Sequence, residues 1–335
     1  MNKRFSGALL CTVLLLTACM AQQVRLDAPN IELARADVLP TGQELEATKH
    51  KVVIFPPDAQ AQPLARDAGL GLSISTELAQ YITQTASNLI DHTQANALAQ
   101  EIQQLETTGA IAHEGPVVAD FALTGTITNA SVATTYYPPQ NWTDKKGQVY
   151  KVHAKCTHSV KVAGVVKVHG TMPRLAHLQS IKLDHASTST EETRSSDCTV
   201  TDAHKHELLT QAAQNAVKKA RVGLQNLFAP QAYIIEAKQN GQNLIFKLSG
   251  GTDSGFNVDD ELTIYTRQLM QNPLTGKDNL ENIELTQGKV SSTLGSNYAW
   301  IIVEDWAGAH RIRLGDFVKV RYSKGFLEKV GGLID

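Results

Sequence analysis

The residues of this sequence that could do chemistry include 11 histidines and the carboxylates near them. The densest group is Asp202, His204 and His206, in which residues 202 and 206 lie one helical turn apart and could bind a metal ion together. A helix is expected to begin here, so Asp202 is better explained as its cap, with the carboxylate near the first free amides. The chain has no Gly-x-Ser-x-Gly, His-Glu-x-x-His or Gly-x-x-x-x-Gly-Lys-Ser/Thr motif. We therefore expect no catalytic residue, no metal site and no cofactor, and hence no enzyme.

One cysteine, Cys19, stands at the end of a segment that looks like a targeting signal. A basic start at Lys3 and Arg4 precedes an apolar stretch over residues 8–16, which is shorter than the about 20 residues that a membrane-spanning helix needs. The tetrapeptide Leu-Thr-Ala-Cys that ends at Cys19 resembles the lipobox of bacterial lipoproteins. In those proteins a signal peptidase cuts before the cysteine, and the thiol carries a diacylglycerol.

The expected location follows from this segment. Residues 1–18 would be a signal peptide that is removed. Ordinary cleavage after Ala18 or Ala21, which would leave a soluble periplasmic protein, is the alternative. Met20 follows the cysteine where lipoproteins retained in the inner membrane carry Asp. We therefore expect a protein that is lipid-anchored through Cys19 in the outer membrane, on its periplasmic side.

Two further cysteines, Cys156 and Cys198, remain once the signal segment is removed and Cys19 is lipidated. In an oxidising compartment such a pair predicts a disulfide. The bond would close 42 residues of chain and stabilise the fold by about 4 kcal/mol in the loop-entropy model. A metal site made of His153, Cys156 and His158 is the alternative, but on a strand residue 153 faces away from residues 156 and 158.

Length and composition limit the classes of protein to which the chain can belong. Its 335 residues predict about two domains. With 42% hydrophobic and 19% charged residues, the composition excludes a disordered tail protein, a collagen-like repeat and a multi-span membrane protein. The net charge of −2, which becomes about −4 without Lys3 and Arg4, gives no indication that nucleic acid is a partner.

The elements that would position these residues begin after a spacer. Residues 19–49 have no sustained apolar period and are expected to form a tether, whose roughly thirty extended residues could reach about 100 Å. Residues 50–229 are expected to form an α/β (α+β) domain that opens with the order β-α-β-α. Its expected strands cover 51–55, 88–91, 120–127, 150–162 and 179–189, and its helices run from Ser73 or Ser75 to 87, over 94–105 and over 204–227. The even-numbered residues of 150–162 share one face, which is predicted to be buried.

Residues 231–335 change character, because helical periods give way to short β segments separated by Gly, Asn and Asp. This pattern predicts a small all-β barrel or sandwich domain. The expected strands cover 233–238, 244–248, 261–267, 283–291, 299–304 and 317–322. Two acidic pairs, Asp259-Asp260 and Glu304-Asp305, lie near its turns, and solvated turns explain them better than acid/base catalysis.

Short motifs in both regions resemble known envelope proteins. They are Lys51–Pro57, Gly69–Ser73, Asn88–Asp91 and Leu123–Ile127 in the first region, and Gly255–Tyr265, Asn272–Gly276, Gly288–Val290 and Leu314–Val318 in the second. The first set, with the long closing helix, is similar to the curli-secretion-channel (CsgG-like) lipoprotein superfamily. The second is similar to the C-terminal domain of flagellar assembly protein T, whose further N-terminal domain has no counterpart in the tether. The resemblance implies a mixed sheet like that of the N-terminal domain of TolB and a place in an envelope machine.

The polar connection over 127–149 is the expected site of partner contacts. A transmembrane barrel hairpin needs about ten residues that alternate apolar side chains outward, and none are present, so pore formation is not expected. The connection contains Tyr136, Tyr137 and Trp142, and an exposed aromatic loop is typical of a partner-binding site. Burial of these rings in the protein's own core explains them equally well from the sequence.

These patterns predict a non-enzymatic lipoprotein that scaffolds or assembles a trans-envelope machine, either the flagellar outer ring or a secretion apparatus. Its lipid would confine it to a plane and raise its effective concentration for other envelope proteins. The resemblance also makes a homo-oligomeric ring plausible. The alternative is a lipoprotein activator of a penicillin-binding peptidoglycan synthase, which the long tether favours and the additional β domain disfavours.

Overall fold

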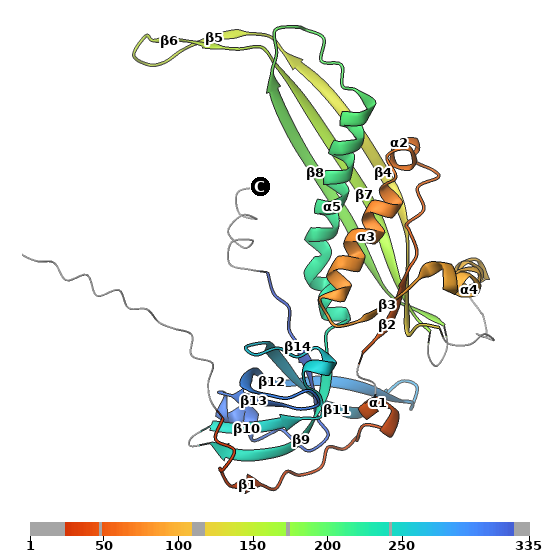
Figure 1. Cartoon of the computed structure of the whole chain (residues 1–335), viewed down its shortest axis with the longest axis vertical. Coiled ribbons are helices and arrows are strands. Elements are labelled where there is room, and N and C mark those ends of the chain that lie inside the picture. The colour runs from red at the N-terminus through yellow and green to blue at the C-terminus, as the bar shows by residue number, and fades with distance from the viewer. Residues whose placement is uncertain (1–23, 47–48, 109–117, 172–174, 241–242, 325–335) are drawn as a thin grey trace, which may run out of the picture.

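A computed structural model describes residues 24–46, 49–108, 118–171, 175–240 and 243–324. The fold is mixed α+β, as the residue patterns predict. A closed barrel lies at one end, and a sheet with very long strands extends away from it under a cover of helices (Figure 1). The sheet and the barrel have separate hydrophobic cores.

The sheet has five strands in the order β3-β2-β4-β7-β8. Their bounds are Lys51–Ile54 for β2, Asn88–Ile90 for β3, Phe121–Tyr137 for β4, Lys155–Gly170 for β7 and Ala176–Glu192 for β8. Strand β2 pairs in parallel with β3 and β4, whereas β4, β7 and β8 are antiparallel to one another. Strands β4 and β7 run past the carboxyl ends of the predicted ranges, to Tyr137 and Gly170, because valine and threonine, which favour strands, continue there. Strand β8 extends three residues beyond its predicted range at each end.

Helices cover both faces of this sheet. Their bounds are Pro63–Asp67 for α2, Leu70–Thr83 for α3, Asn96–Thr108 for α4 and Asp202–Leu227 for α5, with a 3₁₀ turn at His92–Ala95. Leu78 of α3 and Ala216 of α5 pack against Val162 and its neighbours on one face. Ile102 of α4 packs against Val53 and Ala122 on the other face. The long sheet is therefore stiffened along its length by the two helices that share one face, α3 and α5.

The predicted alternation along the second long strand is confirmed from residue 156 onward. Cys156, His158, Val160 and Val162 are all buried. Tyr150, however, belongs to a separate short strand, because pairing stops at residues 153 and 154. Those residues lie opposite Pro138 and Pro139, and proline cannot donate a ladder hydrogen bond.

Two helix starts differ from the predicted ones. Thr201, rather than Asp202, caps α5, since its hydroxyl accepts a hydrogen bond from the amide of His204 at 3.3 Å. Helix α3 begins at Leu70 after Gly69, whose φ of 62° is the left-handed conformation that glycine adopts readily. Ser75 lies inside that helix and donates its hydroxyl to the carbonyl of Leu72. The predicted serine cap is therefore wrong.

The barrel contains six strands, closed by pairing between β9 and β14. Their bounds are Gln231–Asn240 for β9, Asn243–Leu248 for β10, Glu261–Gln271 for β11, Asp278–Leu294 for β12, Ala299–Val303 for β13 and Phe317–Val320 for β14. A 3₁₀ turn at Thr252–Ser254 and the short helix α6, Trp306–Ala309, lie between them. Phe246, Phe256 and Ile301 fill the interior. Of the two predicted architectures, barrel and sandwich, the barrel is confirmed.

Within the predicted tether of residues 19–49, the described residues 24–46 are not free. Residues 24–46, which we call the strap, lie along the barrel instead (Figure 1). The short strand β1, Asn30–Ile31, pairs with β9, and the helix α1, Gly42–Glu46, contributes Glu44 to an ion pair with Arg267. Farther along, Arg313 donates two hydrogen bonds to the carboxylate of Asp37 at 2.9 and 3.1 Å.

The two cores meet directly after α5. Phe228 packs edge-on against Phe121 in the core of the sheet, while the next residue, Ala229, belongs to the core of the barrel. Asn226 of α5 exchanges two hydrogen bonds with the backbone of Tyr322, at 2.9 and 2.8 Å. No flexible linker separates the two units at this point, because consecutive residues are buried on either side.

Candidate partner-binding site

Tyr136 and Tyr137 end strand β4, and Trp142 lies on the small hairpin that follows, at the end of the molecule farthest from the barrel (Figure 1). Its strands are β5, Gln140–Thr143, and β6, Val149–Val152, which pair only with each other. The hairpin continues from β4 and leads into β7, but it bends aside from these strands where Pro138 and Pro139 interrupt the pairing. We call it the tip hairpin.

One face of the tip hairpin is apolar and open to solvent. Trp142 lies opposite Tyr150, and Gln140 lies opposite Val152, so these four side chains share a face. The rings of Trp142 and Tyr150 have centroids 5.5 Å apart, and their side chains are 60% and 47% exposed. Isolated two-stranded hairpins have no core to bury such groups. The apolar area is therefore available to another molecule.

The turn of the tip hairpin is ordered and basic. The carboxylate of Asp144 accepts hydrogen bonds from the amides of Lys146 and Gln148, both at 2.9 Å, and Gly147 has a φ of 81°. Lys145 and Lys146 lie in the turn and Lys151 lies on β6, whereas Asp144 is the one acidic residue of the segment 138–152. The tip hairpin thus combines aromatic rings with an excess of positive charge.

Below the tip hairpin, the long strands are tied to α5. Cys156 of β7 and Cys198, just before the helix, form a disulfide, as the sequence predicts. Two residues farther along β7, His158 is 2% exposed, and its ring nitrogens lie 3.0 Å from the hydroxyl of Thr134 and 3.2 Å from the carboxylate of Glu191. These contacts join β4, β7, β8 and the start of α5. They give the tip hairpin a rigid base.

The predicted site residues have different positions. Tyr137 is 44% exposed, with the ammonium of Lys155 5.4 Å from its ring centroid, whereas Tyr136 is half-buried. Trp142 is the most exposed of the three. Tyr150 and Val152 are not among the predicted site residues, because their alternation predicts a buried strand face. The signal in the sequence that distinguishes them is Pro138-Pro139, which ends the pairing on the opposite strand. Cys19 lies outside the described residues.

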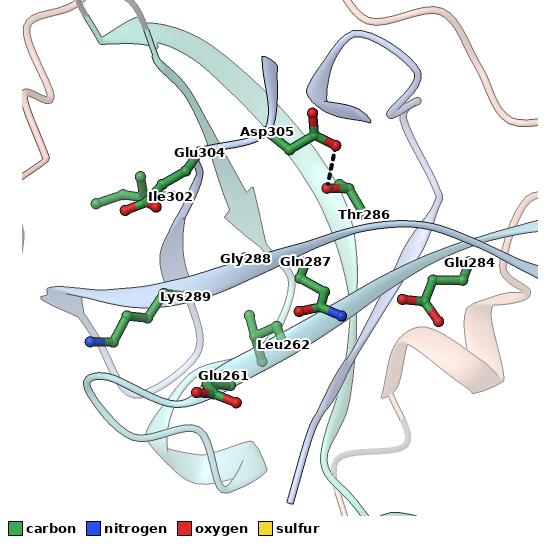
Figure 2. A pocket seen from close by; sticks show the side chains of 10 residues that line it. All are labelled: Glu261, Leu262, Glu284, Thr286, Gln287, Gly288, Lys289, Ile302, Glu304 and Asp305. Carbon is green, nitrogen blue, oxygen red and sulfur yellow. Dashed lines mark hydrogen bonds between the residues drawn. The ribbon is translucent and has the colours of Figure 1, made fainter. Parts of the chain in front are cut away.

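A second candidate is a pocket of about 500 Å³ on the barrel wall beside β11, β12 and β13 (Figure 2). Four carboxylates line it, those of Glu261, Glu284, Glu304 and Asp305. Figure 2 shows Glu284 and Glu304 on opposite sides, and Asp305 accepts a hydrogen bond from Thr286 at 3.1 Å. An acidic lining by itself assigns no reaction to this pocket.

The residues that could have bound a metal are engaged elsewhere. Asp202 binds the ammonium of Lys205 at 2.9 Å, and His204 lies 3.5 Å from Glu207. Within the described part of the chain, no group of three or more His, Cys, Asp or Glu residues could hold a metal ion. Asp260 lies at a turn, as expected, where its carboxylate accepts a hydrogen bond from the amide of Asn257 at 2.7 Å, but it is half-buried rather than fully solvated. Burial raises the pKa of Asp260, and the hydrogen bonds from Asn257 oppose that shift.

Helices that could cross a membrane are absent from the described ranges, where none is both long and apolar enough. No protein-family model matches the chain, and no curated protein matches it.

Two solved structures share limited similarity with the chain. One is the hypothetical protein CT253 from Chlamydia trachomatis, at 16% identity and a TM-score of 0.26, covering 52% of this chain and 98% of that one. The other is a minor lipoprotein from Acinetobacter baumannii, at 10% identity and a TM-score of 0.25, covering 53% of this chain and 94% of that one. Similarity at this level supports no conclusion about function.

Proposed function

We propose that the protein is a non-enzymatic, lipid-anchored adaptor of the bacterial envelope and that the tip hairpin is its protein-binding site. The observation that carries this proposal is the solvent-exposed face of Trp142, Tyr150 and Val152 on an ordered hairpin. Exposed aromatic residues with few internal contacts are typical of binding hot spots. The hairpin is already paired, so binding does not have to order it first.

The chemistry of the tip hairpin also indicates the kind of partner. Its apolar face should bind a complementary apolar groove, and Lys145 and Lys146 in the turn favour acidic residues around that groove. Charges at such a rim mainly raise the rate of association and select the partner. We therefore expect an acidic protein surface, with binding that weakens as the salt concentration rises.

The proposed setting follows from the targeting segment and the short motifs. Lipidation at Cys19 would hold the protein on the periplasmic side of the outer membrane. The resemblance of residues 50–229 to CsgG-like lipoproteins and to the TolB N-terminal domain, and of residues 231–335 to the C-terminal domain of flagellar assembly protein T, favours a scaffold of a trans-envelope machine. The flagellar outer ring and a secretion apparatus are the two machines we propose, with a homo-oligomeric ring as one form of the assembly.

The alternative, an activator of a penicillin-binding peptidoglycan synthase, loses the feature that supported it. That reading rested on a long tether able to carry the folded part across the periplasm. Residues 24–46 lie on the barrel instead, so they are not free to extend. We therefore retain the scaffold as the proposed function.

The experiment that tests this function is crosslinking in native membranes, purification through a C-terminal tag and identification of the captured proteins. A variant carrying Trp142→Ala and Tyr150→Ala should lose the envelope-machine components that the wild-type protein captures. Trp306→Ala is the matched control, since Trp306 is 62% exposed but lies on the barrel. Cys19→Ala should reduce capture by releasing the anchor. Unchanged capture by the double variant would contradict the proposed site, and capture of a peptidoglycan synthase would favour the alternative function.

A further inference from the structure

The strap determines how far the folded protein can be from a lipid on Cys19. Val24 packs on the outer side of the barrel against Ile245, Trp300 and Ile302. Five residue steps separate Cys19 from Val24, and even a fully extended chain of that length spans at most about 18 Å. The whole predicted tether would have allowed about 100 Å, so packing of the strap removes most of that freedom.

The attachment of the strap near Val24 involves several independent contacts. The ammonium of Lys238 donates to the carbonyls of Leu26 and Ala28 at 2.9 and 3.4 Å, and the amide of Gln239 donates to the carbonyl of Pro29 at 3.0 Å. Strand β1 then adds its ladder with β9. Together with the packing of Val24, these bonds hold this part of the strap on the barrel.

From this geometry we propose that the barrel face formed by β10 and β13 around Val24 is the membrane-facing surface of the protein. The inference rests on the proposed lipidation of Cys19. The surface it would face is the headgroup layer of the bilayer that holds the lipid. Arg25 and Leu26 lie exposed beside Val24, and Lys247 lies 5.4 Å from the ring centroid of Tyr298. Aromatic and basic side chains of this kind are suited to a membrane interface.

Electrostatic attraction alone does not orient this face. Glu236 lies 3.7 Å from Lys247, and Asp27 lies 3.5 Å from Arg25, so positive and negative charges alternate around Val24. The short connection to the lipid is what holds the face near the bilayer. The tip hairpin lies at the opposite end of the long sheet (Figure 1), and β4 alone, with 17 residues, spans about 56 Å. The proposed protein-binding site is thus held away from the anchor by a rigid body rather than by a flexible tether.

The test uses lipidated full-length protein in vesicles that contain headgroup-labelled quencher lipids. Cys19 carries the lipid and the other two cysteines are paired, so one introduced cysteine gives one fluorescent label. Asn297→Cys places the label next to Tyr298 on the proposed face, and Lys146→Cys places it on the tip hairpin. We expect strong quenching of the label at residue 297 and little at residue 146. Equal quenching of both labels, or stronger quenching at residue 146, would overturn the proposal.

A linker insertion isolates the role of the short connection. Inserting 20 Gly/Ser residues after Gln22 adds a flexible coil with a root-mean-square length of about 25 Å. We expect this insertion to weaken quenching of the label at residue 297 while leaving the amount of vesicle-bound protein unchanged. No effect of the insertion would overturn the argument that the short connection holds this face at the bilayer, and would leave the anchor intact. Failure of the wild-type protein to sediment with vesicles would instead overturn the lipid anchor, and the inference with it.

Discussion

The ion pair between Glu44 of the strap and Arg267 of the barrel allows a quantitative test of how firmly the strap is held. The guanidinium nitrogen Nη1 of Arg267 lies 2.7 Å from Oε1 of Glu44, and the two side chains are 14% and 37% exposed. Nη2 of Arg267 also donates to the hydroxyl of Tyr233 at 3.2 Å. Glu44→Gln removes the charge, keeps the shape and leaves Arg267 without its carboxylate.

The exposure of the two side chains determines how much stability Glu44→Gln is expected to lose. Exposed ion pairs contribute about 0–1 kcal/mol to the free energy of unfolding, whereas loss of one partner of a buried pair costs about 3–5 kcal/mol. Arg267 is largely buried, but Glu44 is more than one-third exposed, so water screens the attraction. We therefore expect Glu44→Gln to lower the free energy of unfolding by about 1–2 kcal/mol at neutral pH.

The stability difference between the wild type and Glu44→Gln should also depend on pH, in a direction that the pKa of Glu44 determines. Burial by itself raises the pKa of Glu44, but hydrogen bonds from Thr41 and the guanidinium of Arg267 outweigh it and hold this pKa below its ordinary value of 4.5. A carboxyl whose pKa is lowered by folding stabilises the protein above its unfolded pKa and loses that contribution as the pH falls through the folded value. The difference in stability between the wild type and Glu44→Gln should therefore be full at neutral pH and shrink at acidic pH below 4.5.

Urea unfolding at neutral and acidic pH measures this difference, and hydrogen exchange of the α1 amides reports local release of the strap. Glu32→Gln is the matched control, because Glu32 is an exposed acid of the same strap for which the described residues provide no ion pair. It should leave both readouts near wild type. Equal stability of Glu44→Gln and wild type at neutral pH, with unchanged exchange in α1, would refute the assignment of a stabilising role to this ion pair.

Two further predictions concern the disulfide and the contact between the sheet and the barrel. Replacing Cys156 and Cys198 together by Ala should lower the free energy of unfolding by up to about 4 kcal/mol, the loop-entropy value for a separation of 42 residues; urea unfolding checks this, and an unchanged midpoint would contradict it. Gly255→Ala should destabilise the protein by at least about 2 kcal/mol, because Gly255 has a φ of 92° and a Cβ there would lie 2.3 Å from that of Ala86. Urea unfolding measures this loss as well. The helical control Gly223→Ala, where a Cβ meets no atom within 4 Å, should instead stabilise the protein by about 0.5–1 kcal/mol, and equal shifts of the two variants would contradict the argument.

Much of the fold could be predicted because the relevant signals are local. A period of two along Val160 and Val162 places one face of β7 in the core, whatever the strand pairs with. The repeat of small and apolar residues every three to four positions in α5, such as Ala212 and Ala216, likewise marks its buried side. The pairing of Cys156 with Cys198 was predictable because no other pair of cysteines remains once the targeting segment is accounted for.

The candidate site was only partly predictable. The aromatic residues around Pro138-Pro139 are visible in the sequence, but their exposure depends on where the neighbouring strands stop pairing. Val152 has the same alternation as the buried residues that follow it. Residues 153 and 154, which leave the ladder opposite the prolines, separate Val152 from those buried residues. Periodicity alone therefore assigns Val152 to the core.

The sequence by itself therefore determined most of the helices and strands after residue 50, the barrel or sandwich character of the last hundred residues and the cysteine pair. Only the tertiary structure decided that the strap is bound rather than free. The partners Glu44 and Arg267 are 223 residues apart, and Asp37 and Arg313 are 276 apart. An acidic residue that will bind a distant arginine has the same local pattern as one that will remain solvated. The difference arises when the barrel closes and brings a largely buried arginine beside it, because the cost of leaving that charge without a partner then favours the bound strap.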